Sequence, residues 1–105
     1  MEPLRYVVLF HEGFGEPHYD LMFETSPGSD LLTWRSDSWP LQTNAILTPI
    51  AVHRRAYLEY EGEISGGRGA VQSVHAGTFE LQQNDDDLFS GVFESGKSFR
   101  LKKNH

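Results

Sequence analysis

The sequence predicts an all-β protein, a small antiparallel β-barrel of about eight short strands. Apolar runs rich in β-branched and aromatic residues recur at intervals of about 8–12 residues, and turn-forming residues separate them. The sequence lacks the sustained 3.6-residue periodicity that would predict a helix. The chain has 105 residues, enough for a single domain over residues 1–105 with one modest core.

The N-terminal half alternates such runs with turn signals. The first run ends where Gly13 and Gly15 break the pattern, and the second ends at the turn sequence Ser26-Pro27-Gly28. Pro49 and Gly62 limit a longer strand near the middle of the chain. The strands predicted here are 5–10, 18–24, 31–34, one or two short strands within the looser stretch 39–47, and 52–61.

The C-terminal third shows the clearest hairpin pattern. Short stretches rich in Gly, Ser, Asn or Asp separate alternating runs, as expected for tight turns between antiparallel strands. The predicted strands are 70–74, 78–82, 88–93 and 98–102, with turns at 75–77, 84–87 and 95–97.

Composition limits the class of protein and the kind of site. Hydrophobic residues make up 38% of the chain and aromatic residues 12%, which favours packed strands over disorder. No apolar run is long enough for a membrane span, and the first residues lack a signal-peptide pattern, so we expect a cytoplasmic protein without membrane partners. The chain has no cysteine, which fits a reducing compartment. Any metal must therefore be held by nitrogen and oxygen ligands.

The net charge of −6 weighs against nucleic acid as a partner, because phosphate binding is normally supplied by an excess of Lys and Arg. The acids are partly clustered, however, at 85–87 and 59–63. Seven basic residues remain available for a separate basic face: Arg54, Arg55, Arg68, Lys97, Arg100, Lys102 and Lys103.

Two histidines and an aspartate form a candidate metal site. His18 and Asp20 are two residues apart in a predicted strand, so their side chains lie on one face. His11 ends the preceding strand and comes within reach if the two strands pair. Such a set suits manganese, ferrous iron or zinc, with positions left open for water and substrate. The alternative is an ordinary polar strand face.

A second polar group is predicted at His53, Arg55 and Tyr57, which share a face if 52–61 is extended. Imidazole, guanidinium and phenol on one face can together bind a phosphate. The alternative is a solvated strand in which these side chains have no ligand.

A larger pattern joins the two groups. The segment His18-Tyr19-Asp20-Leu21-Met22-Phe23-Glu24 is followed by His53-x-x-x-Tyr57-x-x-Tyr60-Glu61-Gly62-x-Ile64-x-x-Gly67-x-x-Ala70 and by Gly77-Thr78-Phe79. This pattern covers nearly the whole chain and resembles the 3′-phosphoesterase domain of bacterial DNA ligase D. Members of that family are small β-barrels that use manganese or a similar metal to trim 3′-terminal phosphates and ribonucleotides from DNA ends during repair.

The resemblance implies roles for individual residues. His11, His18 and Asp20 would be the metal ligands, while His53 and Tyr57 would contact the phosphate or assist proton transfer. The implied partners are nucleic-acid 3′ ends and other repair proteins.

The chain departs from the family pattern at two places. Met22 stands where the family has an arginine, and the loop between His11 and His18 is one residue longer, so that Glu12 or Glu16 is an alternative to His11 as ligand. Arg55 either replaces the missing cation or pairs with Glu59 or a cross-strand carboxylate.

Three hypotheses follow for the function. The first is an active phosphoesterase, the second is a catalytically degenerate module that still binds metal or phosphate, and the third is a barrel for an unrelated small ligand. His75, in a predicted turn, and the terminal His105 are expected to be exposed and outside the site. Trp34 and Trp39 are expected in the core, with base stacking as the alternative. The Gly66–Gly69 run is either a mobile connection or a backbone approach to phosphate.

Overall fold

Eight strands form one antiparallel sheet in the computed structural model, which describes residues 3–42 and 46–103. The sheet order is β4-β3-β2-β1-β6-β7-β8, and β5 pairs with β6 outside this path. This confirms the predicted all-β antiparallel class. The elements are β1 (Leu4–Glu12), β2 (His18–Glu24), β3 (Leu31–Ser36), β4 (Leu47–His53), the 3-10 helix η1 (Arg55–Leu58), β5 (Gly62–Glu63), β6 (Ala70–Asn84), β7 (Leu88–Phe93) and β8 (Ser98–Lys102).

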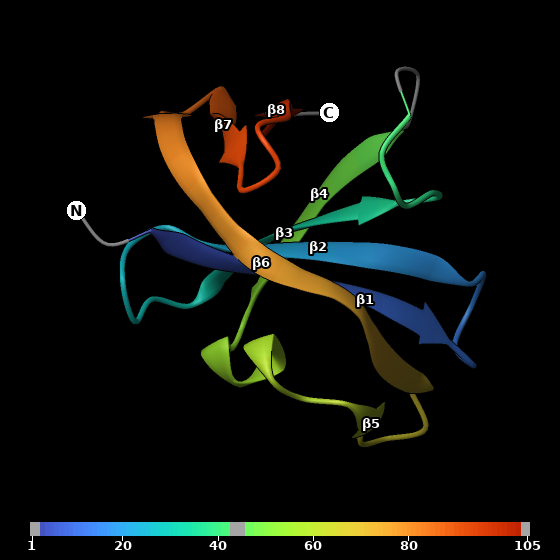
Figure 1. Cartoon of the computed structure of the whole chain (residues 1–105). Helices are drawn as coiled ribbons and strands as arrows, with labels where there is room; N and C mark the ends of the chain where they lie inside the picture. Colours follow the sequence, from blue (N-terminus) through green and yellow to red (C-terminus); the bar gives the residue numbers. More distant parts are fainter. Residues whose placement is uncertain (1–2, 43–45, 104–105) are drawn as a thin grey trace.

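The sheet curls into a half-barrel around the long strand β6, which crosses the molecule with β7 and β8 at one end and β5 at the other (Figure 1). The first and last strands in the order, β4 and β8, are not paired by backbone hydrogen bonds. One side-chain hydrogen bond connects the two ends of the sheet: the indole Nε1 of Trp34 in β3 donates to the carbonyl of Lys102 in β8 at 2.8 Å.

An aromatic core fills the concave side. Phe23 lies at its centre, and its ring centroid is 5.2–6.4 Å from those of six other aromatic side chains. They come from strands far apart in the sheet order, and the curl is what brings them together. The six are Tyr6, Trp34, Phe79, Phe89, Phe93 and Phe99. Trp34 is only 2% exposed, so it is a core residue as expected.

A smaller apolar cluster covers the convex side, where η1 packs on β1, β2 and β3. It contains Val7, Leu9, Met22, Leu31, Leu58 and Val71. Adjacent residues in β1 and β2 thus enter different cores, and both faces of these strands are buried. Among the described residues, no helix is long or apolar enough to cross a membrane.

Three sequence expectations were wrong. One or two short strands were predicted within 39–47, but none of the described residues before Leu47 in this stretch lies in a strand, and β4 begins at Leu47. The predicted strand 52–61 ends at His53 and is followed by η1, because Leu58 folds back onto the convex apolar cluster. The predicted turn at 75–77 does not exist, since β6 is continuous over fifteen residues. Its glycine serves close packing: a Cβ on Gly77 would lie 2.1 Å from Oε1 of Glu94.

Candidate functional site

His11, His18 and Asp20 meet at the end of the β1–β2 hairpin. His11 and His18 are cross-strand partners with ring centroids 4.9 Å apart, and Asp20 follows on the same face. One ligand atom from each residue lies within 4.8 Å of the others. We call these three residues the convex cluster. The pairing that the sequence suggested for His11 is therefore present.

Backbone carbonyls fix which ring nitrogen of each histidine is available. Nδ1 of His18 lies 2.9 Å from the carbonyl of Glu16, and Nε2 of His11 lies 2.7 Å from the carbonyl of Arg68. A carbonyl only accepts hydrogen bonds, so each of these nitrogens carries a proton. In the neutral rings, His18 Nε2 and His11 Nδ1 are left as acceptors. Such carbonyl contacts orient metal-ligating histidines in many proteins.

The free acceptors face the carboxylate of Asp20. His18 Nε2 lies 3.3 Å from Oδ1, and His11 Nδ1 lies 3.7 Å from Oδ2. Although His18 Nε2 and Asp20 Oδ1 are buried and close, their geometry does not make a hydrogen bond, and neither atom has another partner among the described residues. Two buried acceptors in contact repel each other unless a proton or a cation lies between them.

The donor set fits a divalent metal ion. Atoms that bind one cation at about 2.0–2.2 Å lie roughly 3–4 Å apart, which agrees with the separations in the convex cluster. Two imidazoles and one carboxylate suit manganese, ferrous iron or zinc. In the described part of the chain, Glu12 and Glu16 do not join this group as carboxylate ligands. Glu16 contributes only its carbonyl.

The 66–69 loop orients the proposed ligand His11. The carbonyl of Arg68 binds His11, and the loop closes by a 2.7 Å hydrogen bond from Ile64 N–H to the Gly69 carbonyl. A Cβ on Gly69 would lie 2.2 Å from the carbonyl oxygen of Glu12. The glycines therefore allow the loop to approach β1 closely, a role that the sequence alone did not suggest.

A cation lies beside the convex cluster on β3. Arg35 is the cross-strand partner of Asp20, so its side chain starts from the same face. The residue is exposed, and no hydrogen bond or ion pair holds its guanidinium among the described residues. It lines a pocket of about 580 Å³ together with His18. Sequence reasoning missed Arg35 because only strand pairing places it here.

His53 and Tyr57 form a separate group on the same face. Nδ1 of His53 lies 2.9 Å from the carbonyl of Ala51 and 3.1 Å from Oγ1 of Thr33, so in the neutral ring Nε2 is the free nitrogen. The ring of Tyr57 meets it edge to face at 5.5 Å. Thr33 is the cross-strand partner of Met22. The Met22 position thus separates His53 from the convex cluster along the sheet face.

Arg55 does not join His53 and Tyr57. Its guanidinium forms an ion pair with the buried carboxylate of Glu24, which is the cross-strand pairing considered from the sequence. Burial would raise the pKa of Glu24, but hydrogen bonds from Arg55 and from the N–H groups of Arg5 and Gly28, together with the Arg55 charge, hold it below its ordinary value. Met22 is 1% exposed inside the convex apolar cluster, so neither residue offers a cation to a phosphate.

A second histidine–carboxylate group lies on the concave side, and no sequence pattern indicated it. His75 was expected in an exposed turn but lies within β6, with Nε2 2.8 Å from the hydroxyl of Tyr6 and 3.2 Å from Oε1 of Glu94. The Tyr6 hydroxyl donates to Glu94 at 3.1 Å. We call Tyr6, His75 and Glu94 the concave network. Burial and the neighbouring Glu94 carboxylate raise the pKa of Tyr6 well above its ordinary value.

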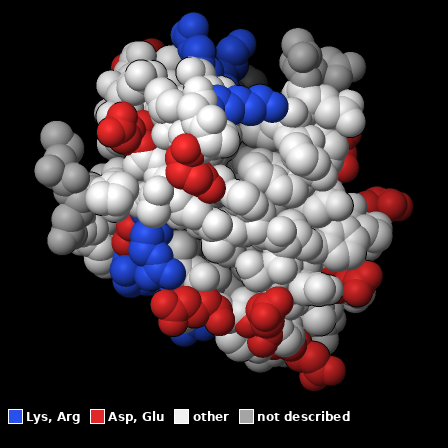
Figure 2. Space-filling view, in the orientation of Figure 1, with Lys and Arg blue, Asp and Glu red and all other residues white. Residues whose placement is uncertain are grey.

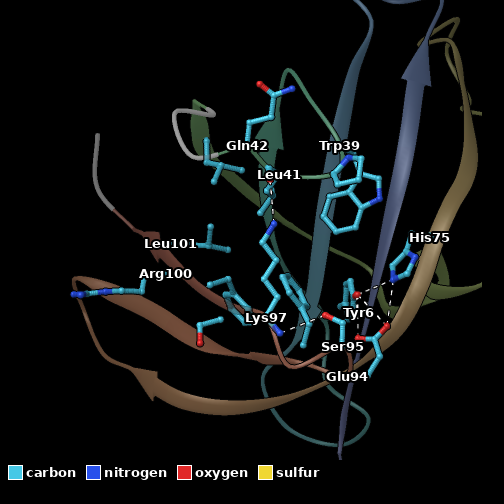
Figure 3. A pocket seen from close by; sticks show the side chains of 15 residues that line it. Tyr6, Trp39, Leu41, Gln42, His75, Glu94, Ser95, Lys97, Arg100 and Leu101 are labelled. Atoms are coloured by element: carbon cyan, nitrogen blue, oxygen red, sulfur yellow. Dashed lines mark hydrogen bonds and ion pairs between the residues drawn. The ribbon is translucent and has the colours of Figure 1, made fainter.

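The concave network lies in a pocket of about 480 Å³ at the mouth of the half-barrel (Figure 3). Trp39 is half-buried there, with its ring 5.5 Å from that of His75, so it is neither a full core residue nor a free surface platform. Lys97 extends along another wall and donates to the carbonyl of Leu41 at 3.3 Å. His105 lies outside the described residues.

Comparison with known proteins finds no family model that matches the chain and no curated protein with a similar sequence. The function must therefore be inferred from the residues themselves and from their geometry.

Proposed function

We propose that the protein is a metal-dependent phosphoesterase that acts on 3′-phosphate or 3′-ribonucleotide ends of nucleic acid. The observation that carries the metal site is the contact between His18 Nε2 and Asp20 Oδ1, two buried acceptors without hydrogen-bond partners among the described residues. The phosphate chemistry is supported by Arg35 beside this contact and by the resemblance to 3′-phosphoesterase domains. Manganese is the ion that we expect.

The ligands proposed are His11 Nδ1, His18 Nε2 and the Asp20 carboxylate. A divalent cation held by these three residues would supply Lewis-acid polarisation of a phosphoryl oxygen and activation of water. The chain supplies the orientation, because the carbonyls of Glu16 and Arg68 hold the two imidazole rings in place. Burial of Asp20, which is 3% exposed, keeps competing water away from the carboxylate.

Two further residues act on the substrate in this proposal. Arg35 attracts the anionic phosphate and binds it through its guanidinium. His53 exchanges a proton at Nε2, while Ala51 and Thr33 hold its Nδ1. Tyr57 limits the orientation of the His53 ring. The proposed setting is cytoplasmic DNA repair, with nucleic-acid ends and other repair proteins as partners.

A degenerate module that binds metal or phosphate without turnover is the second candidate. Met22 and Arg55 supply no cation to the site, and the net charge of −6 disfavours nucleic acid. Figure 2 shows acidic side chains spread over most of this face, with basic side chains at the β8 end and in a second group at the lower left, beside acidic ones.

One experiment separates the two candidates. The purified protein is incubated with manganese and a primer–template that carries either a 3′-phosphate or a single 3′-ribonucleotide, and the products are resolved by length and charge. The phosphoesterase removes the terminal group, and a chelator stops the reaction. A protein that takes up manganese but leaves both substrates intact is the degenerate module.

A further inference from the structure

An exposed aromatic side chain stands beside the convex cluster. Phe14 is 54% exposed in the loop that joins β1 to β2. It lies between Gly13 and Gly15, whose φ angles are +86° and +72°, a conformation that other residues rarely adopt. A Cβ on Gly13 would come within 3.2 Å of the Gly69 backbone, so the loop packs closely against its neighbour. The two glycines and the contact with Gly69 therefore hold Phe14 in an exposed position.

Phe14 and Arg35 line the same pocket of about 580 Å³. His18 forms part of this pocket, and Ile46, 71% exposed, adds a second apolar side chain. Arg35 is the one Lys or Arg among the described residues that line it. Glu16 and Asp37 also line the pocket and repel an anion, so an anion is expected at Arg35, beside His18.

The lining of the pocket thus combines a guanidinium that can bind one phosphate with an exposed aromatic side chain. A phosphate ester without a base would leave Phe14 and Ile46 in water. A nucleotide fits both parts, since its phosphate meets the guanidinium and its base stacks on the ring.

We propose that this pocket is a nucleotide subsite, in which Phe14 stacks on the terminal base of a nucleic-acid strand while Arg35 binds the adjoining phosphate. The inference rests on the proposed function and names its substrate class. Stacking on a phenyl ring accepts any base, so the subsite distinguishes a nucleotide from a bare phosphate without reading sequence.

Nuclear magnetic resonance titrations test the subsite without requiring turnover. The ¹⁵N-labelled protein is titrated with deoxyadenosine 3′-monophosphate and, separately, with inorganic phosphate, once with zinc, which is diamagnetic and fits the donor set, and once with a chelator. The nucleotide is expected to bind roughly 5- to 100-fold more tightly than phosphate, the range of base–aromatic stacking. Phe14→Ala should remove this difference, while Phe14→Trp should keep it.

Two further variants serve as matched comparisons. Arg35→Gln should weaken both ligands alike, because it removes the phosphate contact. Val52→Ala removes an apolar side chain that is 57% exposed and lies outside this pocket, so it should change neither titration. The amide spectrum of each variant shows that it is folded.

Equal affinity for nucleotide and phosphate, or an undiminished difference in Phe14→Ala, would overturn the subsite. Failure of the proposed function looks different: no end is trimmed in the manganese assay, while the base-dependent affinity and its loss in Phe14→Ala persist. In that case the subsite belongs to a binding module.

Discussion

The two faces of the sheet each carry histidine beside a carboxylate, but the two groups are built differently. In the concave network, the Tyr6 hydroxyl accepts from His75 and donates to Glu94, and His75 Nε2 also lies 3.2 Å from Oε1 of Glu94. In the convex cluster, His18 Nε2 and Asp20 Oδ1 touch without any such bridge. The first group is complete as it stands, whereas the second needs a positive charge between its atoms.

Exposure makes the contrast sharper. The side chains of His75 and Glu94 are 40% and 38% exposed, where water can satisfy their remaining polar atoms. Those of His18 and Asp20 are 8% and 5% exposed. An unsatisfied acceptor costs most where water is excluded, so the unpaired group lies where a pairing cation would contribute most. Residue types alone therefore do not identify a metal site; the hydrogen-bond partners do.

The largest expected effect concerns metal binding. Calorimetric titration with manganese should show one site per chain, and His18→Ala or Asp20→Ala should weaken it by more than about 100-fold, because each removes a ligand. His75→Ala, which removes a histidine from the concave network, is the matched control and should bind as the wild type does. Unchanged titrations in both convex variants would reject the metal site.

Turnover should depend on residues of the convex face and not on the concave network. If His53 exchanges a proton with the substrate, His53→Ala should lower turnover by roughly 10²–10⁴-fold and leave manganese affinity nearly intact. His75→Ala should retain the rate, since the concave network lies on the other face. A rate loss in His75→Ala as large as that in His53→Ala would mean that the comparison assigns the chemistry to the wrong face.

Met22 tests whether the convex face can accept a cation at this position. The side chain is buried among Leu9, Leu31 and Leu58, so Met22→Arg should lower the free energy of unfolding by about 3–5 kcal/mol, the scale of an unpaired buried charge. Met22→Leu should cost less than about 1.5 kcal/mol. Urea denaturation measures both. A stable Met22→Arg protein with raised activity would instead show that this position accepts an arginine that binds the phosphate.

The fold was predictable where local pattern and tertiary structure agree. Strand β2 has the predicted bounds, because its residues alternate between two faces and a turn sequence follows it. The errors arose where long-range contacts determine the local backbone structure. Gly77 resembled a turn residue but provides room for Glu94, and the segment after His53 leaves the sheet because Leu58 and Arg55 have partners on β1, β2 and β3.

The candidate site was predictable to a similar extent. Spacing placed His18 and Asp20 on one face, and pairing with His11 followed from a short hairpin. Arg35 could not be found this way, because its position opposite Asp20 depends on the register between β2 and β3. The carbonyl partners of the histidines were equally hidden, since backbone contacts leave no residue-type signal.

The smallest expected effect is on stability, and its sign should differ between the two faces. Tyr6→Phe removes the hydroxyl that joins His75 to Glu94, so the free energy of unfolding should fall by about 1–2 kcal/mol. Asp20→Asn should leave it unchanged or raise it by up to about 1 kcal/mol in a chelator, because an amide N–H can donate to His18 Nε2 where two acceptors now meet.

Urea denaturation in the presence of a chelator measures the stability of both variants against the wild type. With manganese, the stability order of the wild type and Asp20→Asn should reverse. The wild type should then gain stability, by about 2.7 kcal/mol at a hundredfold excess over the dissociation constant, while Asp20→Asn gains less because it has lost a charged ligand. If Asp20→Asn is instead as destabilising as Tyr6→Phe without metal, the Asp20 carboxylate already has a stabilising partner, a protonated histidine. The convex cluster would then be an ion pair complete in itself, like the concave network, and the contrast between the two faces would disappear.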